Sequence, residues 1–194
     1  MSKHITNFIN VTRLNKPIGF LLLFWPCTWG LSLAFYFDKN FYTFCYYLIL
    51  FFLGSVLMRS AGCIVNDIVD EKIDRKVSRT KNRPIASGSL KKSTAWIYVL
   101  ILCLLAFIVL IQFNFLTISL GIFSMIFAFS YPFMKRFTYW PQLFLGFTFN
   151  WGSVMAWTSL MNNIDYLPII FYIGAIFWTL GYDTIYGLQD ASED

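Results

Sequence analysis

The sequence becomes acidic at Gly62-Cys63-Ile64-Val65-Asn66-Asp67-Ile68-Val69-Asp70-Glu71-Lys72-Ile73-Asp74, directly after a long apolar run. Its carboxylates therefore lie where a membrane-spanning segment meets water. If the segment stays helical, Asn66, Asp70 and Asp74 form one stripe, because steps of four residues turn by only about 40° net. Carboxylate and amide oxygens without His or Cys nearby suit a hard divalent cation such as Mg²⁺, which commonly bridges carboxylates to phosphate oxygens. The stretch predicts a magnesium and diphosphate site.

An alternative interpretation is that these charges cap a helix as it leaves the bilayer, solvated and without chemistry. That interpretation suits any single aspartate. It suits the whole run less well, because carboxylates held together raise one another's pKa unless a cation offsets them. The basic residues that follow are suited to hold the same diphosphate: Arg75, Lys76, Arg79, Lys81 and Arg83.

The composition is that of a membrane protein. The 194 residues are 58% hydrophobic and 21% aromatic but only 13% charged, which is not a soluble composition. The net charge of +5 sits in short segments between apolar runs. It forms no basic face of the kind that binds nucleic acid, so we expect no nucleic-acid partner. The four cysteines are widely spaced and predict neither a disulfide framework nor a zinc site.

Runs of nearly twenty apolar residues predict six membrane spans: Ile18–Phe37, Phe41–Met58, Ala95–Ile111, Phe115–Tyr131, Leu143–Leu160 and Leu167–Tyr182. The runs are continuous and do not alternate, whereas a membrane barrel needs lipid-facing and lumen-facing residues in turn. We therefore expect an all-α polytopic helical bundle. No soluble domain is left over, so residues 1–194 are predicted to form one transmembrane domain.

The distribution of positive charge predicts the orientation. With these six spans, every Lys and Arg except Lys39 falls in segments that face one side. Positive charge marks the cytoplasmic side, so both termini are expected there. Residues 1–16 show neither a cleaved signal peptide nor an Arg- and Ser-rich leader, which favours a bacterial inner membrane over a mitochondrial one.

A second acidic cluster ends the chain, Tyr182-Asp183-Thr184-Ile185-Tyr186-Gly187-Leu188-Gln189-Asp190-Ala191-Ser192-Glu193-Asp194. On a helix Asp183, Asp190 and Asp194 fall within about 40° of one another, with Tyr186 on an adjoining face. An acidic tail that only solvates the chain end is the simpler explanation of this cluster. Together, two such stripes at the mouth of an apolar bundle indicate a lipid diphosphate held through one or two magnesium ions.

These motifs resemble a known family. Asn66-Asp67-x-x-Asp70-x-x-x-Asp74 with Arg79-Thr80-x-x-Arg83-Pro84, and Tyr182-Asp183-x-x-Tyr186-x-x-x-Asp190-x-x-x-Asp194, are similar to the two aspartate-rich motifs of the intramembrane aromatic prenyltransferases of the UbiA superfamily. Lys16-Pro17-Ile18-Gly19, residues 21–26 and Tyr131-Pro132-Phe133-Met134-Lys135-Arg136 most resemble the branch that prenylates 4-hydroxybenzoate in ubiquinone synthesis.

The resemblance implies roughly eight or nine transmembrane helices, Mg²⁺, and transfer of a polyprenyl group from its diphosphate to the ring carbon ortho to the hydroxyl of 4-hydroxybenzoate. It implies metal ligands at Asp67, Asp70, Asp74, Asp190 and Asp194. It places Asp70, Asp74, Asp183, Asp190 and Arg136 in the catalytic site. It assigns substrate binding to Asn66, Arg79, Arg83, Lys135 and Tyr186. Arg13 is added from its charge alone, as a partner for the acceptor's carboxylate.

The chain departs from the family chiefly in length. Relatives are expected to continue for roughly a further third, so we expect a fragment, a gene cut short or half of a split enzyme with a separate C-terminal half, and weak or no turnover. Rival functions are transfer to haem, homogentisate or a naphthoate, and a non-catalytic membrane protein that binds Mg²⁺ or lipid diphosphate. A transporter is disfavoured, because its charges would lie near mid-bilayer.

Overall fold

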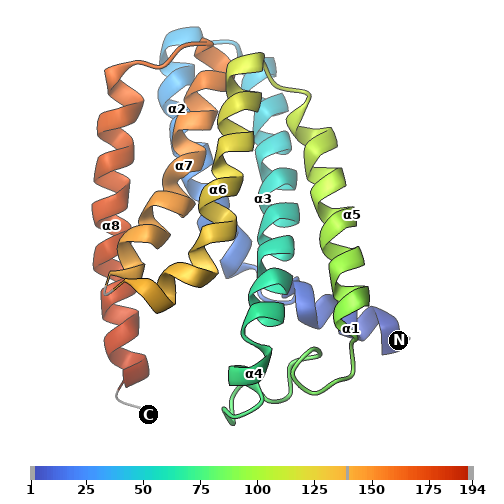
Figure 1. Cartoon of the computed structure of the whole chain (residues 1–194). Coiled ribbons are helices and arrows are strands. Elements are labelled where there is room, and N and C mark those ends of the chain that lie inside the picture. Colours follow the sequence, from blue (N-terminus) through green and yellow to red (C-terminus); the bar gives the residue numbers. More distant parts are fainter. Residues whose placement is uncertain (1–2, 139, 192–194) are drawn as a thin grey trace. The chain divides into compact units, whose positions relative to one another are not determined.

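The computed structural model describes residues 3–138 and 140–191, and the regular secondary structure in these residues is helical throughout (Figure 1). The helices are α1 (Lys3–Thr12), α2 (Ile18–Asp38), α3 (Phe41–Val69), α4 (Glu71–Asp74), α5 (Lys92–Leu110), α6 (Phe115–Phe137), α7 (Pro141–Met161) and α8 (Tyr166–Ala191). Each of the six predicted spans corresponds to one of the long helices. The all-α prediction is confirmed.

Within the described residues, four helices are long and apolar enough to cross a membrane, namely Ile18–Asp38, Phe41–Val69, Lys92–Leu110 and Tyr166–Leu188. A shorter apolar helix covers Phe115–Ala128. Helix α7 was also predicted as a span, but it buries polar side chains such as Asn150 and Thr158. These polar residues lower the mean hydropathy of α7. Their side chains form hydrogen bonds to neighbouring helices. The chain is a multi-pass membrane protein.

Helix α3 is longer than the apolar run that predicts it. It continues past Met58 to Val69, because Ala61, Ile64 and Val65 still have a core to pack against. Asp70 then leaves the helical conformation, with φ −90° and ψ 2°, and begins the short helix α4. The predicted continuous acidic helix is therefore interrupted. Its backbone spacing of four nevertheless persists, since Asp70 N donates to Asn66 O at 2.9 Å and Asp74 N donates to Asp70 O at 2.8 Å.

The first of two compact units comprises Met1–Leu22 and Phe52–Gln112. Its core joins α1, the later part of α3, α5 and the segment between α4 and α5 through Val11, Ile64, Ile85 and Val99. Sequence reasoning missed α1, whose fully buried Val11 belongs to this core. The signal was the spacing of the apolar residues Ile5, Phe8, Ile9 and Val11 among polar ones. Such spacing is typical of an amphipathic helix.

The second unit comprises Leu23–Phe51 and Phe113–Asp194. Its helices pack through small and polar residues, as membrane helices commonly do. A Cβ on Gly30 of α2 would lie 2.1 Å from the Ser153 carbonyl oxygen of α7, so only glycine permits this approach. Asn150 of α7 donates to Ala175 O at 3.1 Å and to Thr179 Oγ1 at 2.8 Å on α8. These contacts join α2, α7 and α8 beside a small apolar cluster formed by Val154, Tyr172 and Ile176.

Candidate functional site

The first aspartate-rich motif forms a buried ion-pair cluster in the first unit. Asp67 Oδ1 accepts hydrogen bonds from Arg13 Nη2 at 2.6 Å and from Arg83 Nη1 at 3.2 Å. The same Arg83 nitrogen donates to Asp74 Oδ2 at 2.8 Å. Asp67 is 2% exposed and Asp74 is 6% exposed. We call these four residues, Arg13, Asp67, Asp74 and Arg83, the ionic clamp.

Local structure brings the clamp together from distant parts of the sequence. Arg13 follows the end of α1 with φ 56°, a left-handed conformation that ends the helix. Arg83 lies in the basic loop (residues 75–91) between α4 and α5. Ile85 of the loop is buried in the core. The Thr80 hydroxyl donates a hydrogen bond to Asp74 O at 3.0 Å, which fixes the loop to α4. The guanidinium of Arg83 is thus placed between the two carboxylates.

The clamp divides the acidic residues of the motif differently from the predicted stripe. Asp74 shares the guanidinium of Arg83 with Asp67, which lies seven residues earlier in the chain. Asn66 and Asp70 are both partly exposed. Asp67 and Asp74 are paired in this way because the basic loop folds back and places Arg83 between their buried carboxylates. Periodicity within the acidic stretch contains no information about that return.

The oxygen atoms of the first motif differ in how well they suit a divalent cation. No group of three or more His, Cys, Asp or Glu side chains is poised to hold a metal in the described part of the chain. Asn66 and Asp70 nevertheless offer amide and carboxylate oxygens one turn apart at the water-facing end of α3, which suits a cation that keeps several waters and shares a diphosphate. Asp67 is less suitable, because two guanidiniums already meet its Oδ1.

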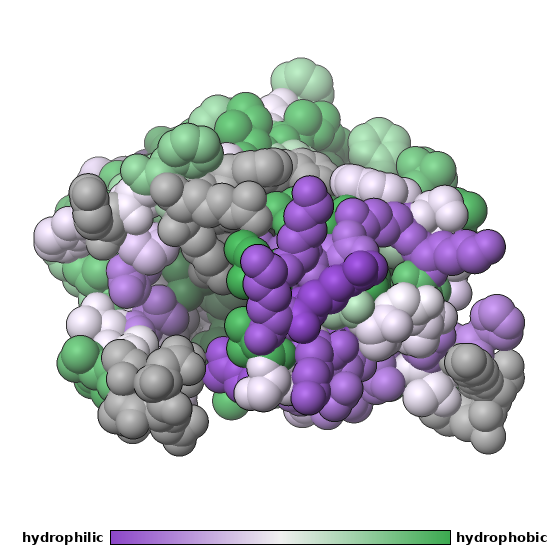
Figure 2. All heavy atoms as spheres, turned by 60° about the horizontal axis from the view of Figure 1, so that its bottom comes forward, coloured by the Kyte–Doolittle hydropathy of each residue, from purple (hydrophilic) through white to green (hydrophobic). Residues whose placement is uncertain are grey.

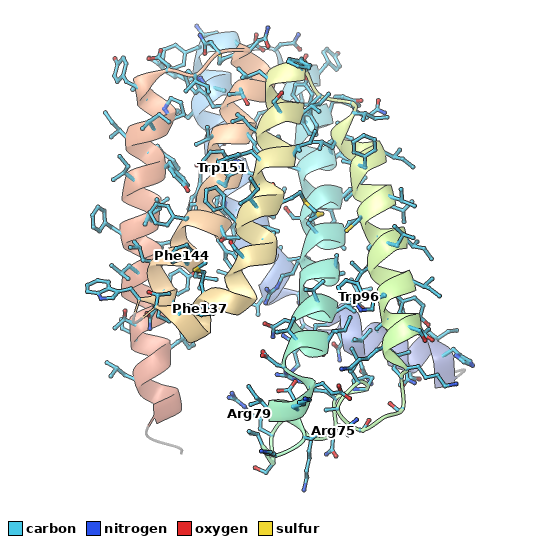
Figure 3. The ribbon with its side chains drawn as sticks, in the orientation of Figure 1. Arg75, Arg79, Trp96, Phe137, Phe144 and Trp151 are labelled. Atoms are coloured by element: carbon cyan, nitrogen blue, oxygen red, sulfur yellow. The ribbon has the colours of Figure 1, made fainter. Side chains whose placement is uncertain are left out.

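Positive charge surrounds the clamp. Figure 2 shows hydrophilic side chains gathered at the end of the molecule where α4 and the basic loop lie. The exposed members are Lys72, Arg75, Lys76, Arg79 and Lys81, and Figure 3 shows Arg75 and Arg79 in this region.

Glu71 carries the countercharge for part of this surface. Its carboxylate pairs with Lys92 and with Arg75 Nη2, the latter at 2.6 Å. The hydrogen bond from Lys92, followed by the charges of both cations, lowers the pKa of Glu71 below its ordinary value. The carboxylate is therefore ionised at neutral pH. It joins the N-terminal end of α5 to α4.

The structure also draws attention to Arg59, which sequence reasoning counted only as a loop charge. Arg59 lies inside α3 and is partly buried. It precedes Asn66 by seven residues, so it lies on the same face about two turns deeper. A Cβ on Gly19 of α2 would lie 2.9 Å from Arg59 Nε, so the guanidinium rests on bare backbone. A cation in an apolar helix was the signal that could have identified it.

The second motif belongs to the second unit, at the end of α8. Asp183 is partly buried there and Tyr186 is 63% exposed. The side chains of Lys135, Arg136 and Asp190 lie outside the described part of the structure, as does Asp194 altogether. The assigned roles of these six residues stay predictions.

The chain is similar to known proteins in both sequence and fold. The model of the UbiA prenyltransferase family matches residues 23–194, which is most of the chain. The chain belongs to the UbiA prenyltransferase family. Among solved structures, the apo structure of a UbiA homolog from Aeropyrum pernix K1 shares its fold, with a TM-score of 0.69 over 87% of this chain and 63% of that one. The two sequences are 24% identical, so this likeness concerns the fold alone.

Sequence relatives in the UbiA family are named 4-hydroxybenzoate prenyltransferases. The chain is 43% identical to the mitochondrial 4-hydroxybenzoate polyprenyltransferase of Homo sapiens, over 96% of this chain and 50% of that protein. The Arabidopsis thaliana protein is likewise 43% identical, over 100% of this chain and 47% of its own length. The 4-hydroxybenzoate octaprenyltransferase of Vibrio atlanticus is 45% identical over 95% of this chain and 63% of that protein. The chain thus spans about half the length of its mitochondrial relatives.

Proposed function

We propose that this chain takes part in transfer of a polyprenyl group from its diphosphate to the ring carbon ortho to the hydroxyl of 4-hydroxybenzoate, a step of ubiquinone synthesis. The observation that carries the proposal is the partly exposed pair Asn66 and Asp70 at the end of an apolar helix, next to a basic loop. A polyprenyl diphosphate has an anionic head group and an apolar tail. The basic loop and the ion ligands suit the head group, and the apolar helix suits the tail. The names of the relatives support the acceptor.

The proposed reaction breaks the C–O bond of the prenyl diphosphate, joins the prenyl carbon to the ring, and releases diphosphate and a proton. When bound, Mg²⁺ supplies charge that stabilises the departing diphosphate. Asn66 and Asp70 would hold the ion, with Asp183, Asp190 and Asp194 as further proposed members of the site. Asp74 is buried and bonded to Arg83, so its proposed role in the site is exerted through that arginine. Arg79, together with Lys135 and Arg136, is proposed to bind the diphosphate oxygens.

For the acceptor, the structure supports Arg59 rather than Arg13. Arg13 is already bonded to the buried Asp67, and moving it would leave that carboxylate with one partner fewer. Arg59 lies deeper along the face that carries Asn66 and rests against Gly19. We propose that its guanidinium binds the carboxylate of 4-hydroxybenzoate, because a charge-assisted hydrogen bond in an apolar setting orients a small anion strongly. The ring would then lie between this carboxylate contact and the diphosphate.

The orientation and compartment are also proposals. The basic loop, α1 and the start of α5 carry most of the positive charge. By the positive-inside rule we propose that this end faces the cytoplasm of a bacterial cell, with the inner membrane as the site of action. The mitochondrial relatives keep a mitochondrial inner membrane as the alternative.

The test is a Mg²⁺-dependent transfer assay on the purified chain in lipid nanodiscs, with 4-hydroxybenzoate and a polyprenyl diphosphate. Asp70→Asn is the test variant, and Asp165→Asn, an aspartate outside both motifs, is the matched control. We expect a low yield of product from the parent and the control, because the chain spans about half the length of its mitochondrial relatives, and none from Asp70→Asn. Equal product from Asp70→Asn, or product without a divalent cation, contradicts the proposed site.

Two other functions are distinguished by the same assay. Product formed with homogentisate, a naphthoate or haem, but not with 4-hydroxybenzoate, would identify another branch of the family. A parent chain that binds the lipid diphosphate yet releases no diphosphate with any acceptor would be a binding protein, and the transferase proposal would be wrong.

A further inference from the structure

Asp67 differs from Asp70 of the same motif in how deeply it is buried. It is 2% exposed, and it is met by two guanidiniums, those of Arg13 and Arg83. Asp70, three residues later, is partly exposed. The two carboxylates therefore experience different surroundings although the sequence pattern presents them as equivalent.

The charge of Asp67 is committed to its two arginines. Burying a carboxylate is costly unless it is paired and hydrogen-bonded, and here both arginines provide that pairing. A divalent cation bound to the same carboxylate would lie beside two fixed positive groups. Like charges at such short range repel strongly where water is excluded. Asp67 is thus a poor ligand for an ion.

The two arginines connect Asp67 to two segments that are distant from it in the sequence. Arg13 stands where α1 ends, and Arg83 stands in the basic loop. A hydrogen bond of 3.0 Å from Asn7 Nδ2 to Ser89 O joins α1 to the end of the same loop. Asp67 therefore lies at the point where α1, α3 and the loop meet.

We propose that Asp67 is a positioning residue and not a metal ligand. Through Arg83 it fixes the basic loop against α3, and through Arg13 it fixes the end of α1. The motif then has two tasks, in which Asn66 and Asp70 face the ion and Asp67 holds the loop that carries the positive charges. The holding role rests on the contacts alone, whereas the statement about the ion rests on the proposed function.

The holding role is tested by limited trypsin digestion of the purified chain in nanodiscs, without substrate or metal. Asp67→Asn removes the charge and keeps the shape. We expect it to speed cleavage in the basic loop about tenfold or more, because proteolysis follows the population of the opened loop. Asp165→Asn, the control, leaves the rate within about twofold, since a change away from buried contacts has little effect.

A second variant keeps the test decisive if Asp67→Asn is poorly folded. Arg83→Gln breaks the Arg83–Asp67 pair from the side of the loop and leaves Asp67 with Arg13. It is expected to speed loop cleavage in the parent chain and to add little in the Asp67→Asn background, because both changes break the pair that holds the loop. Additive effects of the two changes, or a parent rate of cleavage in Asp67→Asn, would overturn the holding role.

The ion is tested separately by binding of Mn²⁺, as a spectroscopic probe for Mg²⁺, in the presence of a polyprenyl diphosphate. We expect Asp70→Asn to weaken binding about tenfold or more and Asp67→Asn to change it by less than about threefold, since only a direct ligand loses its full contribution. Loss of ion binding in Asp67→Asn with a parent rate of loop cleavage would make Asp67 a ligand. Loss of ion binding in neither variant would contradict the proposed function and leave the holding role intact.

Discussion

Replacing Gly19 by alanine is expected to move the guanidinium of Arg59 without unfolding the chain. The added Cβ would lie 2.9 Å from Arg59 Nε and 3.4 Å from Nη2. Carbon and nitrogen atoms prefer about 3.5–4.0 Å, so the guanidinium must withdraw by about half an ångström or more. The atoms it meets are the far end of a flexible side chain, so the fold can absorb the change.

The functional cost follows from hydrogen-bond geometry. If Arg59 binds the acceptor's carboxylate, a shift of this size stretches that contact beyond the useful range of about 2.7–3.2 Å. A hydrogen bond to a charged group contributes about 1.5–3 kcal/mol, so the KM for 4-hydroxybenzoate should rise about 10- to 100-fold. The KM for the polyprenyl diphosphate should stay near the parent value, because the basic loop is untouched.

The assay compares Gly19→Ala with Gly54→Ala, a helical glycine of the same unit whose Cβ would meet nothing within 4 Å. Initial rates are measured in nanodiscs over a range of each substrate, and 4-hydroxybenzoate binding is measured directly by calorimetry. Equal acceptor affinity in Gly19→Ala and Gly54→Ala would refute the assignment of Arg59. A change in the diphosphate KM alone would move Arg59 to the other substrate.

Two further predictions concern the second unit, measured as thermal unfolding in detergent. Gly30→Ala places a methyl group against the rigid backbone of Ser153. At an overpacking cost of about 1–3 kcal/mol it should lower Tm by about 2–12 °C. Gly174→Ala, whose Cβ would meet nothing within 4 Å, is the control, and equal Tm values in the two variants would contradict the close approach. Asn114→Ala removes the N-cap of α6 and the donor to Thr158 O at 2.7 Å, and should cost about 1–2 kcal/mol; an unchanged Tm would show that water replaces these bonds.

Charge and hydropathy were sufficient to predict the six long helices but not their ends or the short helix α1. The six apolar runs predicted the six long helices, because a helix in a membrane must satisfy its own backbone. They did not predict α1 or the extension of α3 to Val69, whose residues are helical because they pack on one another in a core. The four cysteines were expected to form no disulfide, and all four are free thiols in the structure.

The amino-acid sequence by itself determined the family and the membrane class, and it predicts the ligand chemistry, since these depend on residue types and their spacing. Only the tertiary structure decided which aspartate is buried against arginines. Asp67 and Asp70 look alike in the sequence, but the returning loop delivers Arg83 to Asp67, and the end of α1 delivers Arg13. Those arginines are 16 and 54 residues away along the chain. No local pattern encodes such contacts, because they form only when the core brings α1, α3 and the loop together.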